Sequence, residues 1–237
     1  MADNKLDVMV YPIDEPKGST KAFATVSVDD MIAIRGLRVV EGEKGLFVTM
    51  PQSQDKKTNE YHDIAFPLDG DLRKEITKSV LSEHDRTSSL PPDLRGYEKS
   101  DMSAAKTKNV NDIKLDVRVY PLDEPKGSTK AFASVSVDDL IAIRGVRVVE
   151  GEKGLFVAMP QSQDKDKNFH DVAFPLSGAL RKEISKTVLA GSEAADKIAD
   201  RKASLGEKLA VGAEKAARAA SPPQRSAAKS HGAGALE

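Results

Sequence analysis

The chain has 237 residues, a mass of 25.5 kDa and a mean hydropathy of -0.42. Its 36 lysine and arginine residues nearly balance 37 aspartate and glutamate residues, for a net charge of -1. This balance argues against a polycation that coats nucleic acid, so any nucleic-acid site must be a local patch. The absence of cysteine excludes disulfides, thiolate metal sites and cysteine nucleophiles. Short apolar runs and no secretory signal predict a cytoplasmic chain without a membrane span.

An internal repeat dominates the sequence. The stretch LDVMVYPIDEPKGSTKAF begins at Leu6 and recurs as LDVRVYPLDEPKGSTKAF from Leu115. Between Leu6–Leu81 and Leu115–Leu189, about 61 of 75 aligned positions are identical. Such similarity at a fixed offset indicates a duplicated domain.

The repeat divides the chain into four segments. Copy one spans residues 1–81 and copy two spans residues 112–189. Residues 82–111 are polar and contain Pro91-Pro92, which predicts a flexible linker. Residues 190–237 are rich in alanine and lysine and have no counterpart in the repeat. We expect this tail to be partly helical or disordered.

The first part of each copy has the period-two pattern of half-buried strands. We expect a tight corner at Asp29-Asp30 and a β-bulge at Arg35-Gly36, where the alternation shifts by one. Residues 52–60 are polar and predict a loop. The expected strands of copy one are residues 6–11, 22–28, 32–39, 46–50 and 61–66.

The period then changes to that of a helix. Leu72, Ile76 and Val80 are four residues apart and follow Asp69, a suitable N-cap. In copy two, the same pattern follows Ser177 and consists of Leu180, Ile184 and Val188. The predicted class is α+β, with two copies of an antiparallel sheet of about five strands and one C-terminal amphipathic helix.

Each copy also resembles the SpoVG family, known for stage V sporulation protein G. The resemblance is carried by VSVDDMIAIRGLRVVEGEKGLFVTMP, then HDIAFPL, then LRKEITKSVL. It covers nearly all of each copy, or about two-thirds of the chain. It implies a dimerising, site-specific nucleic-acid-binding regulator linked to septation and sporulation. The duplication, the linker and the tail depart from the single short domain of the family.

Basic residues on the outer side of the predicted helix are the first candidate site. The resemblance implies that the start of this helix contacts nucleic acid, and arginine suits phosphate and guanine through its planar fork. The alternative is an ordinary solvated helix face. The candidates are Arg73, Lys74 and Lys78 in copy one and Arg181, Lys182 and Lys186 in copy two.

Arginines around the predicted bulge are the second candidate site. They either extend the basic patch or pair with acidic residues across a turn. The acidic candidates in copy one are Asp29, Asp30 and Glu41. The arginines are Arg35 and Arg38 in copy one and Arg144 and Arg147 in copy two.

No arrangement for catalysis is evident. His62-Asp63 and His170-Asp171 are adjacent pairs, but base catalysis of nucleophilic attack also needs a nucleophile and an oxyanion site. The 4 histidines lack the i, i+4 spacing of a helical zinc site. We therefore expect no enzyme activity, catalytic residue, metal, cofactor or small-molecule substrate.

The expected partners are DNA or RNA and the chain itself. A linker of about 30 residues spans roughly 30 Å as a random coil, so the two copies can pack as an intramolecular pseudo-dimer. Further self-association remains open. The alternative function is a protein-interaction scaffold that uses the sheet edge and the tail without binding nucleic acid.

Overall fold

The computed structural model describes residues 4–16, 18–55, 58–91, 109–122, 127–163 and 167–219, with side chains of the last helix described to Ile198. The chain divides into two compact units, residues 1–195, which contain both copies, and residues 196–237. No helix in the described ranges is long and apolar enough to cross a membrane.

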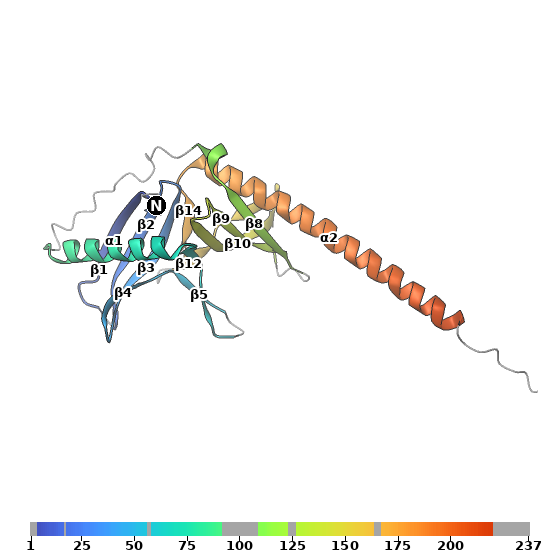
Figure 1. The fold of residues 1–237 in the computed structure, drawn as a ribbon, viewed down its shortest axis with the longest axis horizontal. Coiled ribbons are helices and arrows are strands. Elements are labelled where there is room, and N and C mark those ends of the chain that lie inside the picture. The colour runs from blue at the N-terminus through green and yellow to red at the C-terminus, as the bar shows by residue number, and fades with distance from the viewer. Residues whose placement is uncertain are drawn as a thin grey trace, which may run out of the picture. The chain divides into compact units, whose positions relative to one another are not determined.

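The two copies have the same order of strands and α-helix, and each combines an antiparallel sheet with one helix (Figure 1). The predicted α+β class is therefore confirmed. Copy one consists of β1 (Leu6–Pro12), β2 (Thr20–Val28), β3 (Ile32–Gly42), β4 (Gly45–Thr49), β5 (Gln52–Gln54), β6 (Tyr61–Asp63), β7 (Ala65–Pro67) and α1 (Gly70–Ser88). Copy two consists of the 3-10 helix η2 (Val110–Asp112), β8 (Leu115–Pro121), β9 (Thr129–Val137), β10 (Ile141–Gly151), β11 (Gly154–Ala158), β12 (Gln161–Gln163), β13 (Phe169–Asp171), β14 (Ala173–Pro175) and α2 (Gly178–Ala219).

The core lies between each sheet and its helix. Small and branched side chains of β1, β2 and β3 are buried, and α1 packs across these strands (Figure 1). The helix contributes a stripe of buried residues at the predicted spacing. The most deeply buried side chains include Val26, Ile34, Leu37, Leu72, Ile76 and Val80, with Val135, Ile143, Val146, Leu180, Ile184 and Val188 in copy two.

Two irregular points shape the sheet as predicted. Asp29 and Asp30 both have positive φ, 49° and 52°, which is the geometry of a tight hairpin turn between β2 and β3. The register of β2 on β3 shifts beside Gly36, whose φ is 81°. A side chain is strained at this backbone angle, so glycine serves the bulge. Gly145 repeats the bulge in copy two with φ 75°.

The two copies exchange a strand. β14 pairs antiparallel with β3 of copy one, and β7 pairs in the same way with β10 of copy two. Figure 1 shows β14 beside the strands of copy one. Backbone bonds extend each pairing: Leu68 N donates to Leu140 O over 2.8 Å, and Leu176 N donates to Met31 O over 2.9 Å. The five-stranded sheet of each copy therefore includes one strand from the other copy.

The structure departs from the predicted strands in three places. The strand expected at residues 61–66 is divided into β6 and β7, because β6 pairs with β5 of its own copy whereas β7 pairs with β10. β5 lies in the expected polar loop. Phe47, which we expect in the sheet core from its place among Leu46, Val48 and Met50, is instead 45% exposed.

The helices continue beyond the expected ends of the copies. α1 reaches Ser88 and so includes the first residues of the expected linker. Arg86 forms two hydrogen bonds with Glu83, and Thr87 Oγ1 donates to Glu83 O over 2.8 Å. α2 continues through the expected tail to Ala219. Residues 92–108 of the linker and 220–237 of the tail lie outside the described residues.

Candidate nucleic-acid interface

The first turn of each helix is held in place by a polar cap and an apolar stripe. Asp69 is the N-cap of α1, as predicted, and its carboxylate accepts a hydrogen bond from Leu72 N. In copy two the hydroxyl of Ser177 accepts from Leu180 N over 3.1 Å. Because the stripe is buried against the sheet, the basic residues between its members point to solvent.

In copy one, acidic neighbours hold two of the three predicted basic residues. Arg73 Nη2 lies 2.8 Å from Asp63 Oδ2, and Lys74 Nζ lies 2.8 Å from Asp71 Oδ1. The hydrogen bond and charge of Asp71 raise the pKa of Lys74, and Lys74 lowers the pKa of Asp71 in the same way. Lys78 is exposed and has no ion-pair partner among the described residues.

The helix start of copy two carries less negative charge. Ser177 and Ala179 stand where copy one has Asp69 and Asp71. Lys182 is exposed and, within the described ranges, forms no ion pair. Arg181 repeats the bond of Arg73, with 2.8 Å to Asp171. Lys186 lies 3.4 Å from Glu183. The positive end of the α2 dipole is therefore less screened than that of α1.

Asp63 and Asp171 tie each helix to the preceding ribbon of two short strands. Asp63 accepts from Arg73 with one oxygen and from Gln52 Nε2, 2.9 Å away, with the other. Asp171 accepts from Arg181 and Gln161 in the same way. Each carboxylate thus orients a helix arginine and not the histidine that precedes it in the sequence. His62 is exposed, and its Nε2 lies 3.8 Å from Glu60.

Two of the four sheet arginines, Arg35 and Arg144, contact aromatic rings and not the carboxylates considered from the sequence. The Arg35 guanidinium lies 4.6 Å from the ring centre of Phe174, and that of Arg144 lies 4.7 Å from Phe66. Each contact joins one copy to the strand it receives from the other. The carboxylates are bound by lysines: Lys5 contacts Asp29 through its backbone N–H and Asp30 through its ammonium group, and Lys21 pairs with Glu41.

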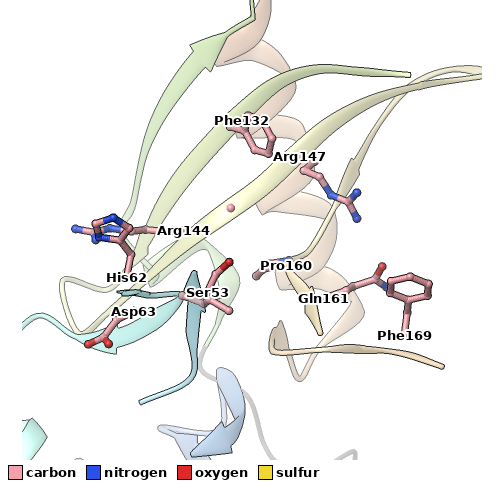
Figure 2. Close-up of a pocket in the computed structure, with 11 residues that line it drawn as sticks. Ser53, His62, Asp63, Phe132, Arg144, Arg147, Pro160, Gln161 and Phe169 are labelled. Atoms are coloured by element: carbon pink, nitrogen blue, oxygen red, sulfur yellow. The ribbon is translucent and has the colours of Figure 1, made fainter. Parts of the chain in front are cut away.

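Two grooves gather the sheet arginines with residues of the opposite copy. One has a volume of about 510 Å³ and contains Arg35, Arg38, Phe23 and Tyr61 of copy one and His170 of copy two. The other, about 330 Å³, contains the corresponding residues: Arg144, Arg147, Phe132 and Phe169 of copy two and His62 of copy one. In Figure 2, His62 and Ser53 approach this second groove from the β5–β6 ribbon, and Phe132 and Arg147 project from the β9 and β10 sheet.

The structure links the two predicted sites without merging them. Asp63, which binds Arg73 of α1, also lines the groove that contains Arg144 and Arg147. Arg73, Lys74 and Lys78 line a separate shallow hollow along α1. The aromatic residues of the grooves are the part that we did not predict. The sequence contained a signal for the exposure of Phe23, because in an alternating strand it lies on the face opposite to that of the buried Ala22 and Ala24.

Comparison with known proteins agrees with the duplication. The sequence model of the family described as SpoVG matches residues 4–86 and again residues 113–193. A septation protein SpoVG of Archaeoglobus fulgidus is 47% identical over 74 residues, 31% of this chain and 86% of its own length. One of Myxococcus xanthus is 40% identical over 83 residues, 35% of this chain and 81% of its own. Each alignment thus covers about one copy here and most of the relative.

Proposed function

The chain belongs to the SpoVG family and carries two family domains in tandem, and on this premise we propose that it is a regulatory protein that binds DNA or RNA. The observation that carries the proposal is the repeated basic helix start. Arg73, Lys74 and Lys78 on α1 correspond to Arg181, Lys182 and Lys186 on α2. Arg73, Lys74, Arg181 and Lys182 lie near the N-termini of their helices, which attract phosphate through the helix dipole and the N–H groups not bound by the cap. Lys78 and Lys186 lie about one turn further along.

The proposal assigns the two copies to one intramolecular pseudo-dimer. The reciprocal pairing of β7 with β10 and of β14 with β3 supports it. A linker between two partner domains typically gives an effective concentration in the millimolar range, which favours pairing within the chain over pairing between chains. One chain then presents two basic helices, and a nucleic acid that reaches both gains avidity.

The role is that of a binding protein and not of an enzyme, and it belongs in the cytoplasm. The septation names of the relatives suggest that the regulated process is cell division. The family resemblance adds sporulation. The small net charge of -1 predicts modest affinity with about three to six phosphates contacted.

Fluorescence anisotropy on labelled DNA and RNA, between 50 and 200 mM salt, tests the proposal. The helix variant is R73A/K74A/R181A/K182A. The control variant, K21A/K44A/K130A/K153A, removes the same charge from lysines at equivalent positions in both copies, away from the helix starts. We expect salt-dependent binding that the helix variant loses and the control largely keeps, with unchanged circular dichroism for both. Absence of binding by the parent at 50 mM salt would instead favour a protein-interaction scaffold.

A further inference from the structure

No aromatic side chain among the described residues is fully buried in the core. The buried hydrophobic residues of the described part of the chain are alanine, valine, leucine, isoleucine and methionine. Seven of the described phenylalanines and tyrosines are more than 40% exposed: Phe23, Phe47, Tyr61, Tyr120, Phe132, Phe156 and Phe169. A protein normally buries such rings, since each can remove about 150–250 Å² from water. Exposed rings that cluster therefore point to a binding surface.

Packing within a hairpin explains two of these rings. Phe47 covers Gly42, where an added Cβ would lie 2.9 Å from the ring, and Phe156 covers Gly151 in the same way at 3.1 Å. Phenylalanine over a strand glycine stabilises a hairpin. Five other rings lack this explanation. Tyr120 lines neither groove, and the remaining four do: Phe23 and Tyr61 in one, Phe132 and Phe169 in the other.

The grooves are positively charged. Arg35 and Arg38 line the first, and Arg144 and Arg147 line the second. Their acidic residues, Asp171 and Asp63, are each neutralised by a helix arginine at 2.8 Å. Two chains docked groove against groove would bring arginines against arginines, which like-charge repulsion opposes. An anionic ligand with flat apolar rings matches both the charge and the aromatic faces.

We propose that the two grooves bind single-stranded nucleic acid, with unpaired bases stacked on Phe23 and Tyr61 in one and on Phe132 and Phe169 in the other. The inference rests on the proposed function and assigns it a second surface, distinct from the helix starts. Stacking on side chains requires an open base face, which a duplex hides within its own stack. Arg38 and Arg147 supply charge beside the rings, and neither has an ion-pair partner in the described part of the chain.

The two copies agree on this surface although they have diverged elsewhere. Position 61 is tyrosine in copy one, and the equivalent position 169 is phenylalanine in copy two. The exchange preserves the ring, which stacking uses, and changes only the hydroxyl, which stacking does not use. Both are highly exposed, at 62% and 64%, so a contribution to the core does not explain why the ring is retained.

A matched pair of variants tests the inference. The groove variant, Y61T/F169T, removes the two most exposed groove rings and leaves every arginine in place. The control variant, F47T/F156T, removes two exposed rings outside the grooves. Binding is measured by anisotropy with 12-nucleotide single strands and with the matching duplex, in both DNA and RNA. Base stacking is followed through quenching of 2-aminopurine placed in the single strand.

We expect the groove variant to bind single strands roughly tenfold more weakly, with loss of 2-aminopurine quenching and little change for the duplex. The variant Y61F/F169Y, which keeps both rings, should bind as the parent does. Equal single-strand affinity of the groove variant and the parent would overturn the inference while leaving duplex binding by the helices intact. Light scattering that shows dissociation of a dimer in the groove variant would also overturn it, since the rings would then join two chains. A parent that binds no nucleic acid would refute the proposed function as well.

Discussion

Moving the two aspartates of the α1 start to the α2 start should reverse which helix start binds phosphate more strongly. Copy one carries Asp69 at the N-cap and Asp71 in the first turn, whereas copy two carries Ser177 and Ala179. The variant D69S/D71A gives copy one the first turn of copy two, and S177D/A179D makes the reverse change. Aspartate and serine are both good N-caps, so neither change should destabilise the helix.

The expected change in the salt dependence of binding follows from the release of one lysine. Lys74 is held 2.8 Å from Asp71, so D69S/D71A should release one cation for a phosphate. One additional contact steepens the plot of log affinity against log salt by about 0.9 on duplex DNA. Over the fourfold range from 50 to 200 mM salt, this equals an additional loss of affinity of about 3.5-fold. S177D/A179D should make the slope shallower by a similar amount, because the introduced carboxylate engages Lys182.

Anisotropy with one labelled duplex over this salt range measures both slopes. The helix-start account requires opposite changes in the two variants. If both variants have the salt slope of the parent, within about 0.3, phosphates do not contact these turns and the account of the site is wrong.

Three further outcomes are expected. D71N should lower the pKa of Lys74 toward its ordinary value of 10.5, because it removes the bonded carboxylate; NMR titration of the lysine side chain measures this, and an unchanged pKa would contradict the Lys74–Asp71 pair. F66L/F174L keeps apolar bulk but removes both rings beneath the sheet arginines, so it should reduce the free energy of unfolding by about 1–2 kcal/mol in urea titrations; no loss would indicate that the cation–π contacts contribute nothing. G36A/G145A should reduce the free energy of unfolding by about 1–2 kcal/mol at each site in urea titrations, because both glycines have positive φ. The control G70A/G178A, where the added Cβ meets open space, should be tolerated. Equal losses of stability in the two variants would argue against the bulges.

Local patterns were sufficient to predict the elements of each copy. Alternation from Ala22 to Val28 predicts a strand with one buried face. The structure buries Ala22, Ala24, Val26 and Val28 as predicted, and also Thr25 and Ser27 on the opposite face, which the alternation does not predict. The shift of that pattern at Gly36 predicts the bulge. Asp69 before the stripe of α1 predicts the N-cap. Each of these features depends on residues close together in sequence, where side-chain period and backbone angle are directly coupled.

Features that depend on the pairing of distant segments were not predictable in this way. β7 and β14 are three residues long, too short for a pattern that identifies a partner strand. The contact of Arg35 with Phe174 exists only because β14 reaches the sheet of the other copy. The grooves depend on the same exchange, so their aromatic and basic residues belong to one surface only after the copies pair.

The central claim is that one chain binds nucleic acid through surfaces that its two copies build together. Light scattering of the protein mixed with a short labelled oligonucleotide, after size-exclusion chromatography, tests this claim most directly. The account predicts that the free protein is a single chain of 25.5 kDa and that each complex with the oligonucleotide also contains a single chain. Complexes with two chains per oligonucleotide, or an oligonucleotide that elutes separately from the protein at 50 mM salt, would contradict it.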